Sequence, residues 1–253
     1  MTSVLRTEGL SLSYGRFTAV NNVSLTLDQG RRYGVLGPNG AGKTSLLNLL
    51  TGTRPATAGR IFLDGRDITS QGPEQRRRAG IGRSYQKTNI FPELSVFDNM
   101  RLAVQSSAGW ALFNPWRNRA HDRRLERRAI EFAEQIGLGE RLGVRAATMS
   151  YGELRQLEIG LALATEPRVL LLDEPTAGMS EDETHLMVAM LQQRMPPSLT
   201  LLIIEHDLKV IEGLTDHVFV FEGGALFEQG SPEQIRSSDR VQQIYFKGAA
   251  ADA

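Results

Sequence analysis

The segment from Gly37 to Thr44, GPNGAGKT, matches the phosphate-loop pattern G-x-x-x-x-G-K-[ST]. Glycines in such a loop let backbone N–H groups turn inward around phosphates, and the following helix adds partial positive charge at its N-terminus. Lys43 can place its ammonium on the β and γ phosphates, and the Thr44 hydroxyl can ligate Mg²⁺. This phosphate loop predicts a binding site for a nucleoside triphosphate. The predicted nucleotide-binding residues here are Gly37, Pro38, Asn39, Gly40, Ala41, Gly42, Lys43, Thr44 and Ser45.

Two features of the chain argue against a chance match. Lysine is scarce, with only 4 lysines against 25 arginines, so a motif that requires lysine seldom arises by accident. The loop also lies between an apolar, strand-like segment at 33–36 and a segment at 44–50 whose apolar spacing suits a helix, which is the context that the motif needs. A glycine-rich turn before an ordinary helix is therefore the weaker interpretation.

A second group of chemical interest ends the apolar run at 169–172, where Asp173 and Glu174 follow four hydrophobic residues. Such a run predicts a buried parallel strand that delivers an acid at its carboxyl end, the edge where ligands bind in open α/β sheets. We expect Asp173 to hold Mg²⁺, directly or through water. Glu174 is placed to orient or deprotonate an attacking water. Taken alone the Asp-Glu pair is weak evidence, and the phosphate loop upstream gives it weight.

The elements that must position these groups follow from the apolar periodicity. Short strands joined by turns are expected in the first third, an apolar stripe of helical spacing spans 125–136, and strands alternate with helices in the last third. This alternation indicates a mainly parallel sheet covered by helices, and the helical middle is expected to be a subdomain inserted into that core. The predicted strands are 4–10, 23–27, 33–36, 79–85, 169–172, 199–204 and 218–221, with an Asp-Gly hairpin turn after 60–63, and the predicted helices include 44–50, 182–194 and a short one from Asp207.

Composition excludes several classes of protein. The chain of 253 residues is 41% hydrophobic and 23% charged, with a formal net charge of zero, so it carries no electrostatic footprint for nucleic acid. The absence of cysteine excludes disulfides and thiolate metal sites. The first residues do not have the pattern of a signal peptide, and no apolar run approaches the ~20 residues that span a bilayer. These features predict a soluble protein.

The segment Met149–Glu153, MSYGE, narrows the class further, because it resembles the signature motif L-S-G-G-Q of ATP-binding cassette (ABC) proteins. The resemblance implies that two cassettes dimerise head to tail, each clamping the ATP of the other. Ser150 and Gly152 would then contact the γ-phosphate of the partner's nucleotide. The signature residues are Ser150, Tyr151, Gly152 and Glu153. A plain helix N-cap at Ser150 is locally compatible with this interpretation.

Three further positions match the family in the expected order. Tyr14 corresponds to the aromatic residue that stacks on adenine, Gln86 to the glutamine that reaches Mg²⁺ and the water, and His206 to the switch histidine near the γ-phosphate. The resemblance thus implies Glu174, His206 and Gln86 as catalytic residues and Thr44, Gln86 and Asp173 as metal-binding residues, with ATP and Mg²⁺ as cofactors. The departures are Tyr151 and Glu153 in the signature and Ser180 where many members carry aspartate.

With the family resemblance, the predicted fold is α/β. It has a P-loop NTPase core of mainly parallel strands with flanking helices, an antiparallel β lobe and an inserted α-helical subdomain. The whole chain, residues 1–253, is predicted to be one nucleotide-binding domain. Residues 1–90 and 165–253 would form the α/β core with the β lobe, and residues 91–164 the helical signature subdomain.

Within the family, the chain looks most like the subunits that power importers of branched-chain amino acids. The resemblance rests on segments 91–99, 157–163 and 173–178 and on the arginine-rich stretch before the signature. It implies a second ABC ATPase subunit, integral membrane permease subunits and, indirectly, a solute-binding protein as partners, at the cytoplasmic face of the inner membrane. Importers of urea or another small solute and lipopolysaccharide exporters have similar cassettes. A soluble ABC ATPase acting on nucleic acid or ribosomes, and a regulatory ATP binder without turnover, are weaker alternatives.

The arginine-rich segment 117–128 admits two interpretations. The first is a solvated face of an amphipathic helix in which Asp122, Glu126 and Glu131 partly compensate the charge. The second is contact with anionic lipid headgroups beneath a transporter. The first is favoured.

Overall fold

The computed structural model describes residues 2–84, 90–107 and 119–243, and for residues 119–122 the backbone only. Its larger sheet has six strands, and five of them, from β10 to β7, run parallel, while β11 pairs antiparallel with β10 at one edge. This confirms the predicted α/β class. The strands in spatial order are β11 (Ala225–Gly230), β10 (His217–Glu222), β4 (Arg32–Leu36), β9 (Thr200–Ile204), β8 (Val169–Asp173) and β7 (Ile81–Arg83).

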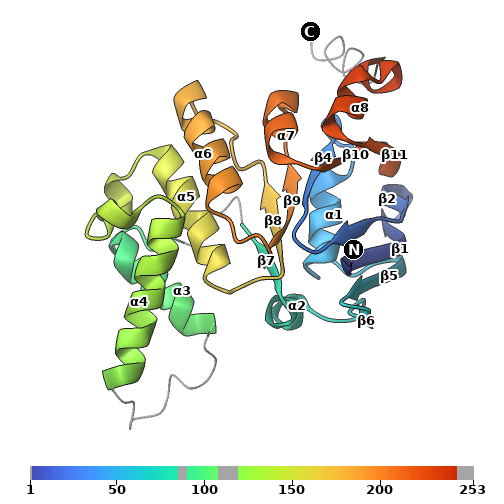
Figure 1. Cartoon of the computed structure of the whole chain (residues 1–253). Helices are drawn as coiled ribbons and strands as arrows, with labels where there is room; N and C mark the ends of the chain where they lie inside the picture. Colours follow the sequence, from blue (N-terminus) through green and yellow to red (C-terminus); the bar gives the residue numbers. More distant parts are fainter. Residues whose placement is uncertain (1, 85–89, 108–118, 244–253) are drawn as a thin grey trace.

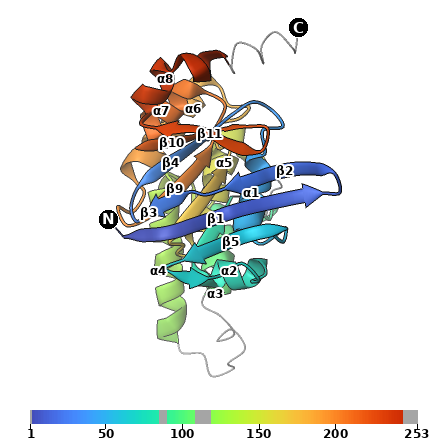
Figure 2. The same cartoon turned by 90° about the vertical axis from the view of Figure 1, so that its right-hand side faces the viewer.

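An antiparallel lobe lies beside this sheet, and Figure 2 shows it facing the viewer. Its longest strand, β1, pairs with three others, and β5 continues into β6 through a turn at Asp64 and Gly65, both with positive φ, as the Asp-Gly turn predicts. The strands are β1 (Ser3–Tyr14), β2 (Phe17–Val23), β3 (Thr26–Asp28), β5 (Ala58–Leu63) and β6 (Arg66–Asp67).

The single strand predicted over 23–27 is wrong, because the chain breaks there into β2 and β3. Both pair with β1, β2 along its second half and β3 along its first. The buried hydroxyl of Thr7 fills the gap between them, accepting from the N–H of Leu25 and donating to the carbonyl of Val23, each at 3.0 Å. The alternation of apolar and polar residues over 23–27 therefore continues across the break between β2 and β3 and gives no sign of it.

The helices lie around the larger sheet, with α3, α4 and α5 grouped at one side (Figure 1). No helix among the described residues is both long and apolar enough to cross a bilayer. The α-helices are α1 (Lys43–Leu50), α2 (Pro73–Ala79), α3 (Val96–Ser107), α4 (Arg119–Gln135), α5 (Tyr151–Leu163), α6 (Glu181–Gln193), α7 (Leu208–Leu214) and α8 (Pro232–Ser237), and two 3-10 turns span Gly139–Arg141 and Ala146–Thr148.

Helix α2 was missed by the periodicity argument, which assigned Ala79 to a strand. Its signals are Pro73 at the first turn and Gly80 at the C-terminal end with φ of 112°. The helix is fixed in place by Arg76, which is buried and donates to the carbonyl of Leu50 at 3.1 Å, at the end of α1. The helix is short and charged, and the side chain that it buries is an arginine. It therefore has no apolar periodicity from which a helix could be predicted.

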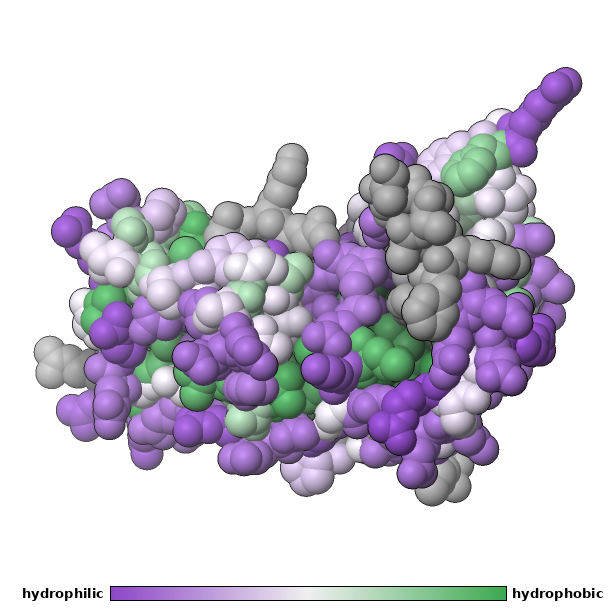
Figure 3. Space-filling view, turned by 90° about the horizontal axis from the view of Figure 1, so that it is seen from above, coloured by the Kyte–Doolittle hydropathy of each residue, from purple (hydrophilic) through white to green (hydrophobic). Residues whose placement is uncertain are grey.

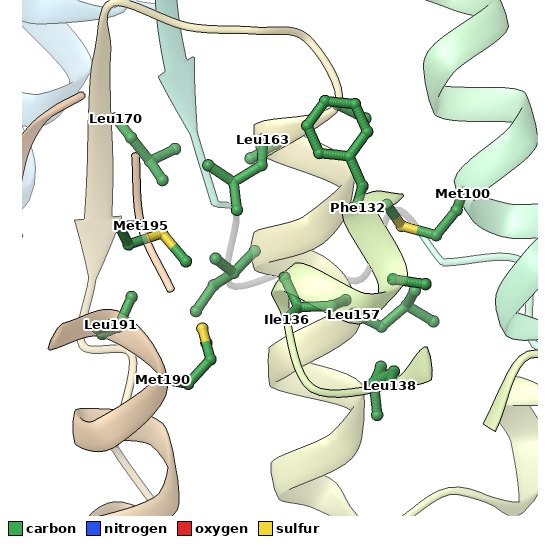
Figure 4. Close-up of a cluster of buried hydrophobic side chains, with 14 of the residues drawn as sticks. Met100, Phe132, Ile136, Leu138, Leu157, Leu163, Leu170, Met190, Leu191 and Met195 are labelled. Carbon is green, nitrogen blue, oxygen red and sulfur yellow. The ribbon is translucent and has the colours of Figure 1, made fainter. Parts of the chain in front are cut away.

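The two faces of the parallel sheet bury different cores. Along β8, Leu170 and Leu172 pack with helices α3 to α6, while Val169 and Leu171 pack with α1 and the antiparallel lobe. Figure 4 shows the first core, in which side chains of α3, α4, α5, α6 and β8 converge. A strand covered on both faces has no polar alternation, which is why the run at 169–172 is continuously apolar.

Candidate active site

The phosphate loop connects β4 to α1 through glycines that no other residue could replace without strain. A Cβ at Gly37 (φ 152°) would lie 2.3 Å from the carbonyl oxygen of Phe221, and one at Gly42 (φ 98°) would lie 2.3 Å from that of Ala19. Gly40 has φ of 78° but no heavy atom near its would-be Cβ, so this part of the loop is open. The loop is therefore pressed against the protein on one side and open on the other, as a phosphate cradle requires.

Lys43 begins α1 and turns its side chain back into the loop. Its ammonium donates to the carbonyl oxygens of Gly37 at 2.7 Å and Pro38 at 3.0 Å, and the residue is buried. Burial lowers the pKa of Lys43, and the nearby carboxylates of Glu174 and Asp173 partly oppose that shift. The loop and the end of β8 therefore lie close enough for their charges to interact.

Asp173 ends β8 and is almost completely buried. Its Oδ2 accepts from the guanidinium of Arg83 at 2.8 Å, whereas its Oδ1 is buried with no hydrogen-bond partner among the described residues. Mg²⁺ binds through oxygen ligands and usually keeps several waters, so a carboxylate oxygen without a hydrogen-bond partner beside a phosphate loop fits such an ion. Thr44 and Ser45 lie on the first turn of α1, directly after the loop.

Glu174 follows Asp173 and adopts a left-handed backbone conformation, with φ of 50°. Its own N–H donates to the carbonyl of Ile204 at 2.9 Å, which fixes this turn to the end of β9. The carboxylate oxygen Oε1 lies 2.6 Å from Nε2 of His206. Strained backbone of this kind is costly and persists where its surroundings hold it. Here it brings together a carboxylate and an imidazole that are 32 residues apart.

Glu205 is a residue that the sequence argument did not single out. It directly follows β9, is 3% exposed, and accepts from the N–H and the hydroxyl of Thr176 at 2.8 and 2.7 Å. Burial raises the pKa of Glu205 despite these bonds. An acid after an apolar run and directly before His206 was the available signal. Through its bonds to Thr176, Glu205 connects the segment after Glu174 to the end of β9, where His206 follows.

The signature segment caps α5. Ser150 is the N-cap, and its hydroxyl and the carboxylate of Glu153 exchange hydrogen bonds with each other's backbone N–H groups at 3.3 and 2.9 Å. The N–H of Gly152 donates at 3.2 Å to Oε1 of Glu183, which belongs to α6. Backbone donors from Ser180 and Gly152 lower the pKa of Glu183. Glu183 was also missed, because its partner lies 31 residues away.

The chain does not bring all the predicted residues to one place. The phosphate loop, Asp173, Glu174 and His206 lie at the ends of β4, β8 and β9, while α5, which the signature segment begins, lies on the other side of β8 from α1 in Figure 1. Tyr14 is half exposed at the end of β1, with the Arg54 guanidinium 6.0 Å from its ring centre. Gln86 lies outside the described residues.

The edge toward which the parallel strands point is the face in Figure 3. Polar residues dominate its rim, and hydrophobic residues are visible in a band between them. A polar rim of this kind is suited to binding a charged ligand and to contact with another protein.

Comparison with known proteins gives consistent results. Residues 20–177 match the family model described as ABC transporter. The chain is 36% identical over 247 residues to the high-affinity branched-chain amino acid transport ATP-binding protein BraF of Pseudomonas aeruginosa, covering 96% of this chain and 97% of that protein. It is 36% identical over 248 residues, with the same coverage, to the corresponding protein LivG of Escherichia coli. Among solved structures, the ADP conformation of an ATP-binding cassette of an ABC transporter superposes with a TM-score of 0.85 at 27% identity, covering 97% of this chain and 99% of that one.

Proposed function

The chain belongs to the ABC transporter family of ATP-binding cassettes, and from this premise we propose that it is the ATP-hydrolysing subunit of an importer of branched-chain amino acids. ABC cassettes of this kind bind ATP and hydrolyse it during transport. The named cargo of the relatives, together with identity along nearly the whole chain, supports the amino-acid assignment.

The observation that carries the catalytic part is the convergence of the phosphate loop, Asp173, Glu174 and His206 at the strand ends. We assign the loop and Lys43 to the ATP phosphates, and Asp173 with Thr44 and Gln86 to Mg²⁺. Bound Mg²⁺ would neutralise charge on the phosphates. Glu174 would orient and deprotonate the attacking water, and His206, in contact with it, would hold that carboxylate and approach the γ-phosphate. Tyr14 is exposed and is available to stack on adenine.

Dimerisation head to tail supplies the second half of each site. A helix N-terminus with a small hydroxyl and a glycine N–H is suited to an anion, and Ser150 and Gly152 form such an end on α5. Since α5 and α1 lie on opposite sides of β8, the natural recipient is the ATP of a second cassette. Residues 91–164, which carry α3, α4 and α5, are proposed as the subdomain that presents this signature.

The permease subunits are proposed to dock in a groove of about 630 Å³ between α2 and β7 on one side and α3 and α5 on the other. Its walls are largely apolar, and Phe91 at its rim is 56% exposed. Arg83, whose guanidinium donates to Asp173, also lines the groove, so a segment bound there would lie beside the ATP site. The chain would then sit at the cytoplasmic face of the inner membrane, with a solute-binding protein acting across it.

Copurification from detergent-solubilised membranes tests the transport role. Recovery of polytopic permease chains with the tagged native protein is expected, and recovery with ribosomes or DNA and no membrane chain would overturn it. Reconstitution of the recovered complex with its binding protein in liposomes then tests the cargo. Uptake of leucine, isoleucine or valine on ATP addition supports the assignment, whereas uptake of urea alone would replace it.

A further inference from the structure

The guanidinium of Arg83 lies between two segments of the active site. Arg83 is the last residue of β7, and one of its terminal nitrogens donates to Oδ2 of Asp173 at 2.8 Å. The other donates to Oδ1 of Asn48 on α1 at 2.7 Å. The side chains of Arg83 and Asp173 are only 8% and 1% exposed. The contact is thus a buried, hydrogen-bonded ion pair that spans three elements.

The partners of Arg83 are not arbitrary parts of the fold. Asn48 lies four residues after Thr44 on α1, so the two share one face of that helix. The chain after β7 leads within three residues to Gln86. One arginine therefore connects the helix that carries Thr44, the strand that carries Asp173 and the strand that leads to Gln86.

No other cation contacts Asp173 within hydrogen-bonding distance in the part of the chain that the structure describes. Lys43, a cation of the loop itself, directs its ammonium to the carbonyls of Gly37 and Pro38. Arg83 holds one oxygen of the Asp173 carboxylate and leaves Oδ1 buried with no partner among the described residues. A carboxylate fixed at one oxygen cannot rotate freely, so the direction of the other oxygen is set before any ligand arrives.

We propose that Arg83 is a positioning residue for the metal-binding carboxylate: it holds Asp173 through Oδ2 and Asn48 through the opposite nitrogen, so that Oδ1 is directed at Mg²⁺ or at its water. The proposal rests on the proposed function, in which Asp173 serves Mg²⁺. Loss of a partner that orients a metal-binding side chain typically lowers metal affinity or activity by about 10- to 100-fold. The competing explanation is an ion pair that only attaches β7 to the sheet.

The test is the substitution Arg83→Lys. Lysine keeps the positive charge, but its single ammonium cannot form the two divergent bonds of a guanidinium fork. The measurement is the affinity for a fluorescent ATP analogue, first in EDTA and then during titration with Mg²⁺. Affinity in EDTA should stay within about twofold, because the phosphate loop is untouched. The Mg²⁺ concentration for half-maximal enhancement of binding should rise about tenfold.

The variant Asn48→Ala removes the second hydrogen-bond partner of Arg83 without changing charge. The Mg²⁺ concentration for half-maximal enhancement should rise in this variant too, but by less than in Arg83→Lys. This variant also decides the question if Arg83→Lys fails to fold, because Asn48→Ala keeps the ion pair intact. Arg78→Lys is the matched control, since Arg78 is exposed on α2 and, among the described residues, forms an ion pair only with Glu74. Its Mg²⁺ titration should match that of the unaltered protein.

The proposal would be overturned if folded Arg83→Lys had a lower melting temperature but an unchanged Mg²⁺ midpoint. If Arg83→Lys does not fold, the same result in Asn48→Ala would overturn it. The ion pair would then have only a structural role. Failure of the proposed function gives a different result. In that case the unaltered protein itself would bind the ATP analogue equally with and without Mg²⁺, or would not bind it.

Discussion

Nε2 of His206 lies 2.6 Å from Oε1 of Glu174, although the two residues follow different strands, β9 and β8. The parallel pairing of these strands in register, with Asp173 opposite Ile204, places their following residues side by side. The left-handed turn at Glu174 and its bond to Ile204 then aim the carboxylate at the imidazole. The pair thus depends on the sheet as much as on the two side chains.

The first prediction concerns Glu174→Gln. Glutamine keeps the size of the side chain and can still contact His206, but it cannot take a proton from water. ATP binding should persist, while the rate of phosphate release falls by about 10²- to 10⁴-fold, the range for loss of a general base. Gel filtration with ATP should show a trapped dimer. Glu181→Gln, on the exposed first turn of α6, is the control, and unchanged hydrolysis in Glu174→Gln would refute the assigned role.

The second prediction concerns Lys43→Ala, which removes the cation from the phosphate loop. Here the loss should appear in ATP binding itself, with affinity reduced about tenfold or more, since a hydrogen bond to a charged group contributes about 1.5–3 kcal/mol. Isothermal titration with ATP and Mg²⁺ measures it. Lys209→Ala, at an exposed position of α7, should leave affinity unchanged. Equal affinities in the two variants would count against the phosphate-loop assignment.

Local sequence predicted the parts of the site that are local. The phosphate loop, the strand ending in Asp173 and Glu174, and the N-cap at Ser150 each depend on neighbours within a few residues, so their patterns carry the information. The contacts of Arg83 with Asp173 and of Gly152 with Glu183 join residues 90 and 31 positions apart. They are set by strand order and helix packing, which periodicity does not encode. Helix α2 escaped because its buried residue is an arginine.

The third prediction uses the buried carboxyl group of Glu205. Its pKa in the folded protein is raised above the ordinary value of 4.5, mainly by burial, so the folded state binds more protons than the unfolded state in the window above that value. The contribution of Glu205 to the free energy of unfolding must then fall as pH rises through this window, and level off above the folded pKa.

Glu205→Gln removes this titration while keeping an acceptor for Thr176. The variant should gain stability relative to the unaltered protein as pH rises from about 5 to about 8, and the gain is measured by urea unfolding at each pH. Glu233→Gln, on the first turn of α8, controls for the loss of one carboxylate. A stability difference that is constant across this range would contradict a raised pKa at Glu205.

The fourth prediction follows from the contact between Gly152 and Glu183. The N–H that we assign to the partner's γ-phosphate is bonded to a carboxylate of the same chain, so the phosphate must displace that carboxylate when the dimer closes. In the Glu174→Gln background, the further change Glu183→Gln should lower the ATP concentration for half-maximal dimerisation about two- to fivefold, the scale of one charge at a helix N-terminus. Glu181→Gln removes a charge from the same turn of α6, whereas the N–H of Gly152 bonds to Glu183, so this control separates local competition from general electrostatics. If Glu183→Gln instead requires more ATP than its control, the carboxylate supports the closed dimer and does not compete with it.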